Sequence, residues 1–254
     1  MGGLLVSVAQ YRDRIGEALN RIWETQTANI ERVCKIMADS IATGGLVHLF
    51  GSGHSVLPVQ DMFPRYGAYP GFHPFMDMRL MWTNVIGSGG AKGLLWLERR
   101  EGYVQVLFEN EPIRTGDVML VFSHGGLNAA GIEVLQEAKK RGLVTVAVTS
   151  LDNYRKREAT HSSGKKLPDV ADHVIDNCIP AEDALVSVGG WKAPVAAGST
   201  VATVTIAMAI VAQVAADLAA QGIAPPVFVS PNVAGIPPDN NSRVYEHYER
   251  SLRR

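Results

Sequence analysis

The sequence predicts an α/β fold in which helices cover both faces of a doubly wound parallel sheet. Short apolar runs alternate with helical patterns along the chain, as they do in βαβ units with right-handed crossovers. Two of these runs pass directly into glycine-rich loops, as buried parallel strands often do at their carboxyl ends. About five strands can be found, whereas an eight-fold βα barrel needs eight, so we expect an open sheet.

The first predicted element is a helical arm, residues 1–43. Apolar residues recur at steps of three and four over residues 11–42, which is the period of an amphipathic helix. This predicts one long helix or two in line. Thr43-Gly44-Gly45 then ends the pattern.

Four apolar runs predict the strands, and a helix over residues 129–141 follows the second of them. The helix ends at Gly142. The strands are expected at residues 46–50, 117–122, 143–148 and within 171–176.

The remaining part of the chain predicts a buried helix and a surface tail. No charged residue occurs between Lys192 and Asp217, and a helix of that length could cross a bilayer at about 1.5 Å per residue. The segment lacks Trp or Tyr belts, so we expect a helix buried in a core or an oligomer interface instead. Residues 225–254, rich in Pro and Asn at first, predict a surface wrap before a short terminal helix. With no linker found, residues 1–254 are expected to form one domain.

Composition excludes several classes of protein. Hydrophobic residues make up 46% and charged residues 19%, a balance that argues against disorder. The 24 basic and 25 acidic residues form no dense basic run, so no nucleic acid is expected as a partner. Cys34 and Cys178 lie far apart, and the first residues do not resemble a signal peptide. We therefore expect a soluble cytoplasmic protein.

Small polar residues at three element ends predict an anion site. Backbone amides at strand ends and helix N-termini can approach an anion where side chains are small, and hydroxyls add further donors. Each element alone could instead be an ordinary turn or helix cap. The elements are Gly51-Ser52-Gly53-His54-Ser55, Ser123-His124-Gly125-Gly126-Leu127-Asn128, and Ser199-Thr200 ahead of the buried helix.

These pieces, in this order, resemble the sugar isomerase (SIS) domain family, and the resemblance covers most of the chain. It implies a flavodoxin-like three-layer sandwich and a phosphosugar ligand. In that family a strand ends in Gly-x-Gly-x-Ser, a later strand ends in a Ser-x-Ser-Gly-x-Thr phosphate loop, and Ser-Thr begins a long apolar helix. Within the family the chain is most similar to a bacterial subgroup classed with the phosphosugar isomerases. That likeness rests on GSGHS, Arg65-Tyr66-Gly67, HSSGKKL at residues 161–167 and PPVFVSPN.

The second loop departs from the family pattern. Gly125 stands where the family usually has its second serine, and Asn128 stands in place of threonine. Asn128 can donate through its amide, Ser123 keeps its hydroxyl, and His124 can supplement them. The loss of a hydroxyl makes a sulfonate or carboxylate head group somewhat more plausible than in the usual family member.

Aldose–ketose isomerisation needs a base that moves a proton between carbons and an acid that serves the oxygens. Glu182 and Asp183, which follow the last strand, are the first choice for the carboxylate, with Asp61 in reserve. His54 can donate to sugar oxygens or titrate near neutral pH. A solvated acidic turn and a surface histidine are the alternatives. No His, Cys and carboxylate pattern has metal-ligand spacing, so we expect neither a metal nor a cofactor.

The sequence therefore predicts a sugar-phosphate isomerase that assembles as a homodimer or homotetramer. Two other functions remain open: a non-catalytic sensor of phosphosugars, and a lyase or etherase that acts on an amino-sugar phosphate.

Overall fold

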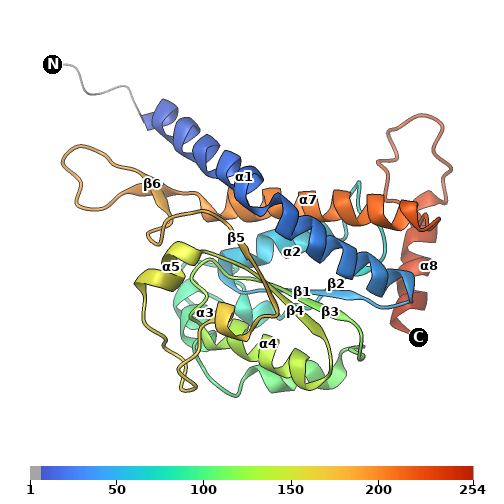
Figure 1. The fold of residues 1–254 in the computed structure, drawn as a ribbon, viewed down its shortest axis with the longest axis horizontal. Helices are drawn as coiled ribbons and strands as arrows, with labels where there is room; N and C mark the ends of the chain where they lie inside the picture. Colours follow the sequence, from blue (N-terminus) through green and yellow to red (C-terminus); the bar gives the residue numbers. More distant parts are fainter. Residues whose placement is uncertain (1–6, 254) are drawn as a thin grey trace.

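Residues 7–253 are described by a computed structural model, in which the predicted doubly wound α/β fold is confirmed (Figure 1). Five strands form one parallel sheet in the order β2-β1-β3-β4-β5. The four strands expected from apolar runs lie within one or two residues of their predicted bounds. In chain order the strands are β1 (Val47–Gly51), β2 (Phe72–Pro74), β3 (Val118–Phe122), β4 (Val144–Thr149) and β5 (His173–Asp176).

Eight α-helices are described in residues 7–253, and the three longest were all expected from the sequence. Their bounds are α1 (Ser7–Ala42), α2 (Val56–Met62), α3 (Ala91–Leu97), α4 (Ala129–Lys140), α5 (Leu151–Lys156), α6 (Leu167–Val170), α7 (Ser199–Ala220) and α8 (Asn240–Leu252). Three 3₁₀ segments join them: η1 (Gly53–Ser55), η2 (Met78–Leu80) and η3 (Val104–Asn110).

Two apolar layers sandwich the sheet, because successive strand residues point to opposite faces. Val47 and Leu49 of β1 belong to a core with α1, α2 and α7, whereas Phe50 belongs to a second core with α4 and the segment 80–108. Figure 1 shows α1 and α7 crossing one face of the sheet and α4 lying on the other. The carboxyl ends of the strands open between these layers.

Three strands were not anticipated. β2 has only three residues and ends in Pro74, so its sequence shows little alternation of apolar and polar residues. It pairs with the edge of β1 that β3 leaves free. β6 (Ala184–Val186) and β7 (Val195–Ala197) form a separate antiparallel ribbon. This ribbon carries the chain from the end of β5 to the start of α7.

Helix α7 explains the long uncharged segment of the sequence. By length and composition it is the one helix of the described chain that could cross a membrane, which is weak evidence for a span. Its inner face packs on α1 and α2, and 44% of its most apolar window is buried. Other positions of α7 are half-buried or exposed, and Val201 is 40% exposed.

Residues 225–239 form no helix or strand, and α8 follows them as the terminal helix. Phe228 is buried against Phe63, with ring centroids 5.7 Å apart. Tyr248 of α8 meets Phe63 and hydrogen-bonds to His73 at 2.6 Å. These contacts attach the tail to the outer part of α2 and β2.

Candidate functional site

The two glycine loops lie side by side because β1 and β3 are paired. Gly51 is the register partner of Phe122, so the chain leaves both strands at the same edge of the sheet. Gly51 allows a tight exit, since a Cβ there would lie 2.0 Å from the Ser55 carbonyl oxygen. The predicted neighbourhood of residues 51–55 and 123–128 is therefore present.

The second loop forms a cradle of backbone amides at the N-terminus of α4. The amide of Gly126 donates to Ser123 Oγ at 3.2 Å, which closes the turn. The amides of Gly125, Leu127 and Asn128 donate to no acceptor within residues 7–253. Free amides at the start of a twelve-residue helix favour an anion, because the helix dipole adds partial positive charge there.

A buried carboxylate that the sequence reasoning missed lies between these two loops. Glu98 is the C-cap of α3 and is only 4% exposed. Its carboxylate accepts a hydrogen bond from Ser52 Oγ at 2.7 Å. Burial raises the pKa of Glu98, while the Ser52 hydroxyl, Arg99 and the Asn128 side chain oppose that rise.

Glu98 changes the roles of two predicted anion donors. Ser52 donates to this carboxylate, and the Asn128 side chain makes no capping hydrogen bond to α4 and contributes to the pKa of Glu98 instead. Both residues thus lie beside a titratable group as well as beside the amide cradle. The only sequence signal was a single carboxylate after the apolar helix AKGLLWL.

Other predicted hydroxyls remain available to a ligand. Ser55 and Thr200 make no side-chain hydrogen bond with another described residue. The η1 segment that holds Ser55 also contacts α7, whose first turn carries Thr200. Ser199, in contrast, is buried and donates to Asp183 Oδ2 at 2.9 Å.

The structure gives the two predicted acidic residues very different settings. Asp183 has a φ of 62° and caps α7: its Oδ1 accepts the amides of Gly198 at 3.1 Å and Ser199 at 2.7 Å. That carboxylate is fully occupied in stabilising the start of the helix. Glu182 is exposed and forms no hydrogen bond or ion pair with another described residue.

The two loop histidines each contact a residue outside the two glycine loops. His54 is exposed, and its ring lies edge-on to Trp82 with centroids 4.5 Å apart. His124 Nδ1 accepts from the Asn177 amide at 3.2 Å, and the Asn177 Oδ1 in turn accepts from the Ile179 amide. Burial lowers the pKa of His124, against the opposing effect of the Asp183 carboxylate. His124 therefore fastens the loop to the end of β5 as a neutral imidazole.

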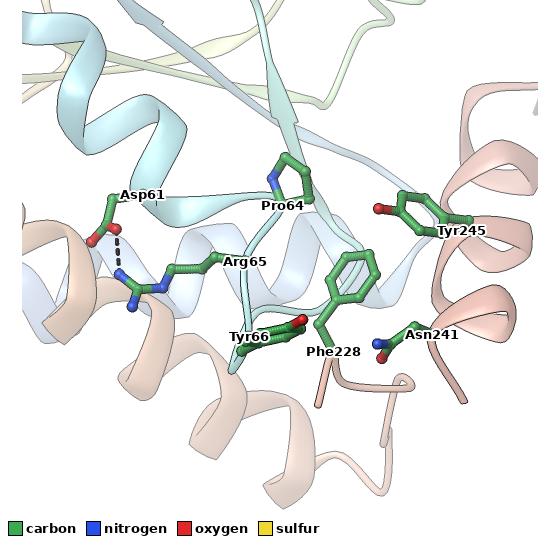
Figure 2. Close-up of a pocket in the computed structure, with 7 residues that line it drawn as sticks. All are labelled: Asp61, Pro64, Arg65, Tyr66, Phe228, Asn241 and Tyr245. Carbon is green, nitrogen blue, oxygen red and sulfur yellow. Dashed lines mark hydrogen bonds and ion pairs between the residues drawn. The ribbon is translucent and has the colours of Figure 1, made fainter. Parts of the chain in front are cut away.

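Asp61, the reserve carboxylate, lines a separate cavity of about 490 Å³. Figure 2 shows Asp61 and Arg65 pointing toward each other, with the rings of Tyr66, Phe228 and Tyr245 around the opening. Asp61 lies near the C-terminal end of α2, about 9 Å along the helix from the first loop. It does not belong to the group formed by Glu98 and the amide cradle.

Comparisons with known proteins agree with this architecture. The SIS domain family matches residues 10–150. A UPF0309 protein of Caldanaerobacter subterraneus is 32% identical over 246 residues, covering 96% of this chain and 98% of its own. One of Listeria innocua is 32% identical over 243 residues and covers 96% of each chain.

Solved structures share the fold at low sequence identity. The phosphoheptose isomerase of Neisseria gonorrhoeae has a TM-score of 0.54 and 16% identity, covering 84% of this chain and 98% of that one. That of Francisella tularensis has a TM-score of 0.53 at the same identity and the same coverage.

Proposed function

This chain belongs to the SIS domain family, and from that premise we propose that it binds a sugar phosphate at the carboxyl edge of the sheet and isomerises it between aldose and ketose. The observation that carries the proposal is the set of free amides at Gly125, Leu127 and Asn128, beside buried Glu98. The amides and the Ser123 and Ser55 hydroxyls bind the phosphate. A soluble cytoplasmic setting suits such a ligand.

Glu98 is the proposed base of this reaction. A carboxylate with a raised pKa holds a proton more firmly near neutral pH, as a group that removes and returns a carbon-bound proton must. Its Ser52 hydrogen bond fixes its position between the loops. In the proposed step Glu98 takes the proton from the carbon next to the carbonyl, and the enediol forms. The same carboxyl then returns the proton to the neighbouring carbon.

The acid that serves the sugar oxygens is assigned to His54. It is two residues from Ser52 and is exposed, and among the described residues its aromatic neighbour is the Trp82 ring. Turning the imidazole from Trp82 toward the loop would bring it to a bound sugar. Glu182 and Asp183 remain the rival carboxylates, although the helix cap occupies Asp183.

Deuterium exchange at sugar C2 tests the proposal. In deuterated water, isomerisation through an enediol places deuterium at C2 of the aldose phosphate, which NMR detects. Glu98→Gln should slow this exchange by about 10²–10⁴-fold while phosphosugar binding persists. Glu249→Gln, at an exposed position on α8, serves as the matched control and should keep full exchange.

Full exchange in Glu98→Gln would move the base to Glu182 or Asp183, with Asp61 in reserve. These are tested as Glu182→Gln, Asp183→Asn and Asp61→Asn. A protein that binds sugar phosphates without any exchange would instead be a sensor, and release of a substituent from an amino-sugar phosphate would indicate a lyase or etherase. A thermal-shift panel of sugar phosphates identifies the ligand first. A ligand present at 100 times its Kd raises the free energy of unfolding by about 2.7 kcal/mol, which such a panel detects.

A further inference from the structure

A second polar cluster lies outside the proposed sugar-phosphate site. It joins Glu101 from the loop after α3, Glu133 from the second turn of α4, and His161 from the segment between α5 and α6. One ligand atom of each lies within 4.8 Å of the other two. The three residues come from separate segments, so sequence spacing does not reveal them.

Two of the three side chains are buried with a polar atom left unpartnered. The His161 side chain is 6% exposed and that of Glu133 is 7% exposed. Within the described residues, His161 Nε2 and Glu133 Oε2 make no hydrogen bond. A buried polar atom without a partner is costly, so this arrangement points to a missing ligand.

The unpartnered nitrogen is directed at the two carboxylates. His161 Nε2 lies 3.7 Å from Glu133 Oε1 and 3.8 Å from Glu101 Oε2, too far for a hydrogen bond to either. In a tetrahedral zinc site with ligand bonds of 2.0–2.1 Å, neighbouring ligand atoms are about 3.3–3.4 Å apart. Movements of a few tenths of an ångström would bring these two pairs to that spacing.

The surrounding hydrogen bonds already orient each ligand. Gly102 N donates to Glu133 Oε1 at 2.7 Å, and Ser162 N donates to Glu101 Oε1 at 2.7 Å. His161 Nδ1 lies 2.8 Å from Ser163 Oγ, a partner for the second ring nitrogen of a metal-bound imidazole. Such outer contacts typically fix the ligands of a metal site.

The local charge also favours a cation. No Lys or Arg of the described chain pairs with Glu101 or Glu133, so no fixed cation neutralises these two carboxylates. One imidazole and two carboxylates make a borderline donor set that suits Zn²⁺ better than Mg²⁺ or Ca²⁺, which prefer oxygen alone. The Glu101 side chain is 38% exposed, which leaves room for a water as a fourth ligand.

We propose that Glu101, Glu133 and His161 bind one Zn²⁺ ion. The ion would tie residues 157–166 to α4 and to the loop after α3. That segment already holds the amide cradle from outside, since Thr160 Oγ1 donates to the Leu127 carbonyl at 2.7 Å and Leu167 N donates to the Gly126 carbonyl at 2.9 Å. The proposed site is structural, and it departs from the expectation from sequence that the protein holds no metal.

Zinc titration of the EDTA-treated full-length chain tests this proposal, and it needs no sugar phosphate. Calorimetry should give one Zn²⁺ per chain, with at least about 100-fold weaker binding in Glu133→Gln and in His161→Gln. Glu137→Gln is the matched control: it lies one turn further along α4, is also buried, and pairs with Lys140 and Arg141 instead. Its zinc affinity should stay within about two-fold of the parent.

Cobalt gives a second readout, because Co²⁺ in a tetrahedral site shows strong visible absorption. Added Zn²⁺ should displace the cobalt from the site and abolish this absorption. Glu133→Gln keeps an oxygen for Gly102 N and should fold; if it does not, Glu101→Gln at the partly exposed ligand replaces it. Failure of the chain to bind zinc, or equal zinc affinity in the ligand variants, overturns the proposal. The proposal is also overturned if NMR shows that the His161 imidazole titrates with pH in the same way with and without zinc.

Discussion

Glu98 shows how its surroundings decide the chemistry of a single residue. The same side chain on a helix surface would be an ordinary solvated carboxylate, but here it is 4% exposed and receives the Ser52 hydroxyl. Burial makes the charged form unfavourable and raises the pKa of Glu98. The residue therefore binds its proton more tightly in the folded chain than in the unfolded chain.

The first prediction concerns the pH dependence of stability. Above the unfolded pKa of a glutamate, the unfolded chain has released this proton while the folded chain retains it. The free energy of unfolding then falls as pH rises, until the raised folded pKa is passed. Glu98→Gln removes this contribution. As the pH rises from 4 to 8, the melting temperature of the variant should therefore increase relative to that of the parent. A difference that is constant with pH, measured by thermal melts, would contradict the raised pKa.

A second prediction concerns Ser123, whose hydroxyl accepts the Gly126 amide and faces the cradle. Ser123→Ala should weaken sugar-phosphate binding by about 1–3 kcal/mol if the hydroxyl meets a charged phosphate oxygen. Calorimetry with the sugar phosphate found by thermal shift measures this loss. Ser251→Ala, on α8, is the control. Unchanged affinity in a folded Ser123→Ala protein would remove the hydroxyl from the anion site.

At the scale of elements, the start of α7 depends on a residue from the β5–β6 connection. Asp183 caps the helix from outside, through two backbone amides and the Ser199 hydroxyl. Its positive φ lets the carboxylate turn toward the helix, a conformation that aspartate tolerates better than most residues. The acidic pair after β5 therefore divides into one structural residue and one exposed residue.

The third prediction follows from this cap. Asp183→Asn keeps the size and the backbone tolerance of the residue, but removes the negative charge from the N-terminus of α7. The free energy of unfolding should fall by about 0.3–1 kcal/mol, and by up to about 2 in a partly buried site. Urea titration measures this, with the exposed neighbour Glu182→Gln as the control. Equal stability of the two variants would mean that the charge does not stabilise the helix.

At the scale of the whole molecule, α7 is the element left incomplete. It is apolar around most of its circumference, yet 44% of its most apolar window is buried by this chain. A helix that is apolar all round must be covered by something, and the chain itself covers only the face toward α1 and α2. A second copy of the chain is the expected cover.

The fourth prediction is therefore a homodimer or homotetramer whose interface includes a face of α1 or α7. Sedimentation at micromolar concentration should show the larger species. Val201→Lys, at a position 40% exposed in the single chain, should shift the protein toward monomer. The surface variant Arg243→Lys, on α8, should leave the assembly unchanged. A parent protein that sediments as a monomer would defeat the prediction.

The sequence by itself determined the elements that have a strong local pattern. The helical period over residues 11–42 predicts α1, and apolar runs that stop at glycine loops predict four strands and their carboxyl ends. These patterns are local because hydrogen bonding in a helix and burial of a parallel strand impose a period on neighbouring residues. The position of residues 51–55 beside residues 123–128 then follows from pairing two adjacent parallel strands.

Only the tertiary structure decided which side chains meet. Glu98 reaches Ser52, Asp183 reaches Ser199, and Glu133 approaches His161, each across a loop or crossover whose path has no periodic signature. The short strand β2 and the ribbon β6–β7 also depend on partners distant in the chain. The physical reason is the same in each case: burial and hydrogen bonding between distant segments depend on strand register and loop path. Composition and spacing do not encode these locally.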